Sequence, residues 1–354
     1  MFDLKTLVRP NILALKPYSS ARDEFKGDEG IFLDANENPF GTLNRYPNSD
    51  QKNLKQKLTA YNGIANNNTF VGNGSDEIID LIYRIFCNPE KDKALTFTPT
   101  FGMYQVAADI NNIELITLPL NDEFQINRND LTSYFEDENL KLIFICSPNN
   151  PTGNCFNKSD IEFILKNFKG IVIIDEAYAD FSDQQSWQNS FEAYPNLIVI
   201  QTFSKAWALA AARIGIAYAN NEIIQLLNNV KMPYNISKLN ETAAIEALEN
   251  RKDFEANKQI ILDEKALLIQ ELKTLDIIKK IYPSDANFLL VEVEDANELY
   301  QNLVEQKVIT RNRNSLVENC IRITVGRPEE NKKLIKALTD LIGFKNLSGL
   351  NTTK

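Results

Sequence analysis

The chain has 354 residues, a formal net charge of −10 and no histidine. This length suffices for a large domain and a smaller one, and a composition of 44% hydrophobic and 24% charged residues is typical of a globular protein. The acidic balance argues against a nucleic-acid-binding surface. The absence of histidine excludes Ser-His-Asp and Cys-His catalysis and removes the commonest metal ligand, so we expect no metal.

Four cysteines (Cys87, Cys146, Cys155 and Cys320) form no Cys-x-x-Cys pair. Unpaired thiols of this kind are typical of a reducing compartment. The first ten residues lack the apolar core of a secretory signal, and no apolar run approaches the length that spans a bilayer. We therefore expect a cytoplasmic protein without membrane or nucleic-acid partners.

Residues 1–30 are predicted to form an N-terminal arm that packs on the smaller domain or on a partner subunit. From 31 to 237 strands and helices alternate, which predicts an α/β domain with a mostly parallel, doubly wound sheet. Its predicted strands are 93–97, 113–117, 141–146, 171–175, 197–201 and 214–218. Its predicted helices are 49–61, 75–87, 101–110, 158–167 and 206–211.

Residues 238–354 are predicted to form a smaller α+β domain after a break at 231–237. A long helix is expected at 238–273. Strands at 277–281, 287–293 and 320–325 and helices at 295–305 and 328–342 should follow.

Three predicted strands of the large domain end in polar side chains. One strand is followed by Lys205, the one before it by Asp175 and Tyr178, and an earlier one by Asn150. Continuous apolar runs predict strands buried on both faces, and in open α/β sheets ligands bind outside the carboxyl ends of such strands. An amine, a carboxylate, a phenol and an amide at one edge suit a pyridine aldehyde that carries a phosphate.

Lys205 has neighbours that would favour Schiff-base chemistry. A second cation such as Arg213 would lower the pKa of its amine, and the Ser204 hydroxyl beside that cation would bind a phosphate. Ser75 and Asp76 follow a glycine-rich turn at a predicted helix N-terminus, a place that binds anions. Taken alone, that turn is better explained as a capping sequence.

Asp175 follows four buried apolar residues, where a carboxylate is costly unless it is paired. A pyridinium nitrogen would be such a partner, although an N-cap or a surface ion pair would also explain this residue. Tyr178 can point back to the same place. Tyr104 suits either stacking on a heteroaromatic ring or packing in the core.

Arg322 alternates with isoleucines in a predicted strand, so it lies either on a solvated face or in a cleft where it binds a carboxylate. Arg311 and Arg313 form either a second anion site or a solvated loop.

The assembled motifs resemble the fold-type I pyridoxal-phosphate aminotransferases over nearly the whole chain. Within these, segments 16–22, 33–39 and 45–47 are most similar to the histidinol-phosphate aminotransferase group. The remaining matching segments are 74–77, 99–104, 149–153, 175–178, 204–206, 213–215 and 322–326.

The resemblance implies pyridoxal 5′-phosphate as cofactor. Lys205 would form the Schiff base, Asp175 would pair with the pyridine nitrogen, and Tyr104 would stack on the ring. The ring oxygen would be bound by Tyr178 and Asn150, and the phosphate by Ser75, Asp76, Ser204 and Arg213.

The resemblance also implies a homodimer with shared active sites, in which Tyr46 reaches the phosphate of the neighbouring subunit. Arg322 would hold the substrate carboxylate, and Tyr18, Asn36 and Arg311 would complete the substrate site. The implied reaction exchanges an amino group between L-histidinol phosphate and 2-oxoglutarate by ping-pong kinetics.

Three other functions remain open from the sequence. An amino-acid phosphate decarboxylase similar to threonine-phosphate decarboxylase would share the cofactor residues, as would an aromatic amino-acid aminotransferase. A transcription regulator using this fold would need an added DNA-binding domain, for which only about 30 residues precede the large domain.

Overall fold

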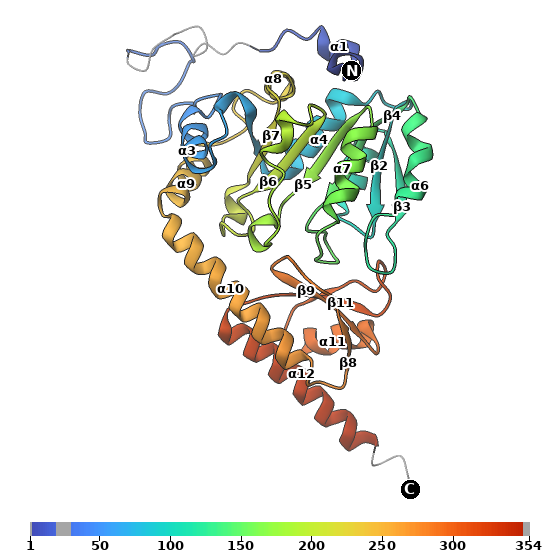
Figure 1. The fold of residues 1–354 in the computed structure, drawn as a ribbon. Helices are drawn as coiled ribbons and strands as arrows, with labels where there is room; N and C mark the ends of the chain where they lie inside the picture. Colours follow the sequence, from blue (N-terminus) through green and yellow to red (C-terminus); the bar gives the residue numbers. More distant parts are fainter. Residues whose placement is uncertain (1, 19–29, 350–354) are drawn as a thin grey trace.

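The computed structural model describes residues 2–18 and 30–349, with side chains up to residue 342. Part of the 16–22 motif and the end of the chain lie outside this description. Two sheets lie one above the other and are connected by the long helix α10, Arg251–Leu272 (Figure 1).

The larger sheet has seven strands in the order β1-β7-β6-β5-β4-β2-β3. Its strands are β1 Thr69–Asn73, β2 Lys93–Thr98, β3 Glu114–Pro119, β4 Leu140–Cys146, β5 Ile171–Asp175, β6 Leu197–Thr202 and β7 Ile214–Ala219. All run parallel except β7, which pairs antiparallel with both β1 and β6. The six predicted strands and the mostly parallel sheet are confirmed. Strand β1 was not predicted, because a glycine interrupts its short apolar run.

Alternate residues of β4 bury on opposite faces of the sheet. Ile143 and Ile145 lie in one hydrophobic core, and Leu142 and Phe144 lie in the other. Helices cover both faces, which explains why the central strands are continuously apolar. These helices are α3 Lys52–Asn62, α4 Gly74–Phe86, α5 Met103–Ile110, α6 Arg128–Leu131, α7 Lys158–Asn167 and α8 Asn221–Val230.

The helix predicted at 206–211 is wrong. The backbone N–H of Phe203 donates to Ile214, and the N–H of Leu209 donates to Phe203. The segment therefore folds back as a turn between antiparallel β6 and β7, with only a short 3-10 helix at Ala210–Ala212. Ala208 and Arg213 have φ values of 56° and 53° there, which a continuous helix does not allow.

The smaller sheet is antiparallel, in the order β10-β11-β9-β8. Its strands are β8 Ile278–Ile281, β9 Phe288–Val293, β10 Arg311–Asn312 and β11 Cys320–Thr324, and helices α11 Ala296–Glu305 and α12 Pro328–Gly349 pack on it. The predicted α+β pattern is confirmed, and β10 is the strand that the prediction omitted.

The helix predicted at 238–273 is two helices, because Asn250 leaves the helical conformation between α9, Lys238–Glu249, and α10. Ala244, Ile245 and Leu248 of α9 pack into the core of the larger sheet. Helix α9 therefore contributes to the core of the larger sheet, although it follows the predicted domain boundary at residue 237.

The N-terminal segment packs on the larger domain. Leu4 and Val8 share a core cluster with the α4 residues Ile82 and Phe86, and the Arg9 N–H donates to Ile85 at 3.0 Å. Of the two predicted locations for the arm, the smaller domain is wrong for this part, because the apolar side chains cover α4 instead. Packing of the arm on a partner subunit stays a prediction. No helix in the described part of the chain is long and apolar enough to cross a membrane.

Candidate active site

A cavity of about 680 Å³ lies between the carboxyl ends of the parallel strands and the smaller sheet. Four of its lining residues lie at the ends of three neighbouring strands. Asn150 follows β4, Asp175 is the last residue of β5 and Tyr178 follows it, and Lys205 follows β6. The structure thus brings together the four side chains that the strand-end argument placed at one edge.

Asp175 is 2% exposed and has two hydrogen-bond donors. The Tyr104 hydroxyl donates to Oδ2 at 2.8 Å, and the Ala177 N–H donates to Oδ1 at 3.1 Å. Burial outweighs these two hydrogen bonds, which lower the pKa of Asp175, and raises it from 3.8 to about 6. A buried carboxylate of this kind fits a protonated ring nitrogen, which would restore its ionised form.

The amine of Lys205 opens onto the cavity, 5.6 Å from the centre of the Tyr178 ring. Burial lowers the pKa of Lys205, and Arg322 lowers it further, against the opposing effect of Asp175. Arg213 lowers it too, in the predicted direction, but by less than Arg322 does. A lysine whose amine gives up its proton readily is suited to forming a Schiff base.

The N-terminus of α4 and the start of β7 form a cup on the large-domain side of the cavity. Arg213 extends its Nη2 to within 3.3 Å of Asp76 and its Nη1 to within 3.4 Å of the Ser204 hydroxyl. A Cβ on Gly215 would lie 2.4 Å from the carbonyl carbon of Gly74, so only glycine permits this approach. A guanidinium and hydroxyls at a helix N-terminus fit a phosphate monoester.

Arg322 connects the smaller sheet to the strand ends of the larger one. Its Nη1 donates to Asn150 Oδ1 at 2.5 Å, and Asn150 Nδ2 lies 3.5 Å from the Tyr178 hydroxyl. Arg311 lies opposite Arg322 in the β10–β11 pair and lines the same cavity. The sequence left two alternatives open for Arg322, a solvated face and a cleft, and Arg322 lines the cavity.

Tyr104 is not placed to stack on a ligand. Its ring is fully buried, stacks on Phe144 at 5.0 Å and contacts the edge of Phe101 at 5.6 Å. The position of Tyr104 therefore does not fit the predicted stacking role, and its hydroxyl instead donates a hydrogen bond to Asp175. Phe101 lines the cavity and was missed, although it stands three residues after the end of β2, as Lys205 does after β6.

Tyr18, Asn36 and Tyr46 do not line the cavity of their own chain. Tyr18 and Tyr46 are exposed by 72% and 53%, and the Tyr46 ring stacks on Tyr234 at 4.4 Å. Asn36 is exposed in a left-handed conformation with a φ of 54°. One chain alone does not bring these three residues to the site.

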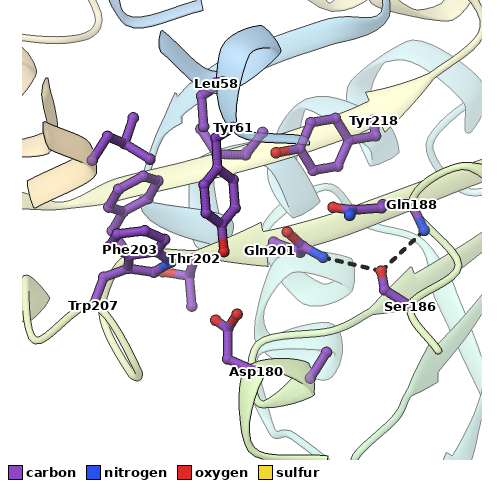
Figure 2. A pocket seen from close by; sticks show the side chains of 13 residues that line it. Leu58, Tyr61, Asp180, Ser186, Gln188, Gln201, Thr202, Phe203, Trp207 and Tyr218 are labelled. Carbon is purple, nitrogen blue, oxygen red and sulfur yellow. Dashed lines mark hydrogen bonds between the residues drawn. The ribbon is translucent and has the colours of Figure 1, made fainter. Parts of the chain in front are cut away.

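A second, smaller cavity of about 100 Å³ lies beside the first and shares Thr202 with it (Figure 2). Figure 2 shows the Tyr61 hydroxyl pointing towards Asp180, and burial raises the pKa of Asp180 to about 6. The space is too small for a pyridine ring with a phosphate. We therefore assign the candidate active site to the larger cavity.

A mostly parallel sheet with a lysine, a buried carboxylate and an anion cup at its carboxyl edge is the architecture of the fold-type I pyridoxal-phosphate enzymes. Residues 24–338 match the family described as aminotransferase class I and II. The chain belongs to this family.

Relatives and solved structures agree with this assignment. The chain is 50% identical to a histidinol-phosphate aminotransferase of Christiangramia forsetii, over 96% of this chain and 98% of that protein. It is 49% identical to one from Flavobacterium psychrophilum, over 96% and 99%. The crystal structure of the histidinol-phosphate aminotransferase from Clostridium acetobutylicum superposes with a TM-score of 0.77 at 26% identity, covering 84% of this chain and 91% of that one.

Proposed function

We propose that the chain is a pyridoxal-phosphate-dependent aminotransferase that exchanges an amino group between L-histidinol phosphate and 2-oxoglutarate. One observation carries the proposal: Lys205 and Asp175 share a cavity that has an anion cup on one side and arginines on the other. The relatives that are 45–50% identical over at least 95% of the chain, all histidinol-phosphate aminotransferases, support this choice of substrate.

The residues present fit the cofactor. Asp175 would pair with the ring nitrogen, Asn150 and Tyr178 would bind the ring oxygen, and Phe101 would face the ring in the place first expected for Tyr104. Ser75, Ser204 and Arg213 would hold the phosphate, with Asp76 orienting Arg213 through their 3.3 Å contact. When bound, the cofactor supplies an electron sink for the substrate carbon.

Lys205 would move the proton. Since its pKa is lowered by burial and by Arg322, the amine can accept the α-proton of the substrate and return it as general base and acid. Arg322 would hold the carboxylate of glutamate, with its guanidinium positioned by Asn150.

The four buried free cysteines are in keeping with a reducing compartment such as the cytoplasm.

An exchange assay tests the proposal. Purified protein with pyridoxal 5′-phosphate should transfer the amino group of L-histidinol phosphate to 2-oxoglutarate with parallel double-reciprocal plots, and phenylalanine should compete poorly. Release of carbon dioxide without any need for a 2-oxo acid would instead identify a decarboxylase. Preference for phenylalanine would identify an aromatic amino-acid aminotransferase.

We also infer that the active form is a homodimer. Residues 30–51 contain no helix or strand and expose Ile31, Leu33 and Phe40 by 92%, 88% and 82%. Clustered apolar side chains at such exposure indicate a protein interface. Arg45 pairs at 2.6 Å with Glu37, whose side chain is 3% exposed, so the segment has a defined shape although it is extended. In a dimer that forms through this segment, Tyr46, Tyr18 and Asn36 of one subunit would lie near the cavity of the other.

Mixed dimers should show whether Tyr46 acts in the partner's site. We expect Tyr46→Phe and Lys205→Ala each to be impaired alone, and their 1:1 mixture to recover about a quarter of wild-type activity, because about half of the dimers are mixed and each has one intact site. The measurement is the exchange rate after joint unfolding and refolding. A mixture no more active than the mean of the two separate variants would contradict a shared site.

A further inference from the structure

The wall of the cavity that the smaller sheet provides is almost entirely cationic. Its lining residues are Arg311, Arg313, Leu316 and Arg322. Arg311 lies directly opposite Arg322 in the β10–β11 pair, and Arg313 is two residues further along, hence on the same face. The Arg313 N–H donates to Cys320 at 2.9 Å, which continues the pairing beyond the end of β10. The three guanidiniums therefore converge because of strand register.

Among the described residues, no carboxylate forms an ion pair with these three guanidiniums. The Nε atoms of Arg313 and Arg322 are buried and have no hydrogen-bond partner among the described residues. Burial and, after it, the positive charges of Arg322 and Arg311 lower the pKa of Arg313 to about 10. The two acids of the cavity, Asp76 and Asp175, belong to the opposite wall and already have partners. Like charges held together in this way are stabilised by a bound anion.

The two substrates of the proposed reaction place different anions at this wall. In glutamate the carbon that carries the amine bears a carboxylate. In L-histidinol phosphate that same carbon bears a phosphate ester through a methylene group, and there is no carboxylate. A carboxylate has two oxygens to accept hydrogen bonds, whereas a phosphate dianion has three and a larger charge.

We propose that Arg313 is a specificity-determining residue that, together with Arg311 and Arg322, forms a three-guanidinium subsite for a phosphate dianion. The inference rests on the proposed function for the identity of the phosphate ester. Arg322 serves both substrates, since it is the guanidinium positioned by Asn150. Arg313 supplies an additional guanidinium, which hydrogen-bonds to a phosphate but not to a carboxylate.

The test compares Arg313→Gln with wild type in the two half-reactions of the holoenzyme, followed by the absorbance of the bound cofactor. We expect the apparent affinity for L-histidinol phosphate to fall about 10- to 100-fold, as for loss of a charge-assisted hydrogen bond. Reaction with L-glutamate, and with L-histidinol, which lacks the phosphate, should change by less than about threefold. Arg327→Gln, at an exposed position outside the cavity, is the matched control and should change none of these.

A second readout does not depend on histidinol phosphate as substrate. Inorganic phosphate should stabilise the wild-type holoenzyme against heat more than it stabilises Arg313→Gln. Arg313→Lys should give an intermediate result, because it keeps the charge but lacks the planar guanidinium. Equal losses with glutamate and histidinol phosphate, or unchanged phosphate stabilisation in Arg313→Gln, would overturn the assignment. If wild type fails to react with histidinol phosphate while the phosphate effect persists, the proposed function is wrong and the anion subsite stands.

Discussion

Replacing Lys205 with alanine should abolish amino transfer and leave the fold intact. Lys205 is the only lysine that lines the cavity among the described residues, so no other amine can replace it as the covalent anchor or as the proton carrier. General acid–base catalysis alone contributes about 10²- to 10⁴-fold, and loss of the covalent step adds to this. We expect the exchange rate to fall by at least about 10⁴-fold.

The measurement is single-turnover amino transfer together with the visible absorbance of the bound cofactor. Lys205→Ala should lose the absorbance band of the lysine-linked cofactor, and added methylamine should restore part of the rate. Lys252→Ala, on the exposed surface of α10, is the control and should behave as wild type. Retention of more than about a hundredth of the wild-type rate by Lys205→Ala would refute its role.

Replacing Asp175 with asparagine should have opposite effects on stability and on activity. Because burial raises the pKa of this carboxyl from 3.8 to about 6, the folded protein binds its proton more tightly than the unfolded chain does. The ionised carboxylate therefore opposes folding, and this destabilisation develops as the pH rises from about 4 to about 6. Asparagine cannot ionise, so the cofactor-free variant should be more stable than wild type above pH 6, by up to about 3 kcal/mol.

The same substitution removes the negative charge that would hold the ring nitrogen protonated. We expect weaker cofactor binding and a fall in exchange rate of about 10²-fold or more, since a neutral amide does not favour the pyridinium form. Urea unfolding of the cofactor-free protein at pH 7 and at pH 4 checks the first effect, and the gain should vanish at the lower pH. A variant less stable than wild type at pH 7 but of equal activity would contradict both parts.

Much of the larger domain was predictable because its determinants are local. Strands buried on both faces must be continuous apolar runs, and each run of this kind, such as Ile171–Asp175, could be recognised without knowing its neighbours. The placement of Lys205, Asp175 and Asn150 at one edge followed from a general rule about the carboxyl ends of parallel strands. The family resemblance depended on the same local motifs.

Other features depend on contacts between residues distant in the chain, and no local pattern contains them. Tyr104 and Phe101 lie three residues apart in one aromatic turn. Only the packing of Tyr104 against Phe144, with its hydroxyl on Asp175, leaves Phe101 facing the cavity. The segment after Lys205 has helix-forming alanines, yet hydrogen bonds from Phe203 to Ile214 bend it into a turn.

The sequence by itself determined the alternation of strands and helices, the order of the polar strand ends and hence the class of chemistry, since these follow from hydrophobic periodicity along the chain. The tertiary structure alone decided which aromatic ring faces the cavity, that α9 packs with the larger sheet, and that Arg313 joins Arg311 and Arg322 on one face. The physical reason is that burial and strand register are set by partners far apart in sequence, whereas periodicity is a property of neighbours.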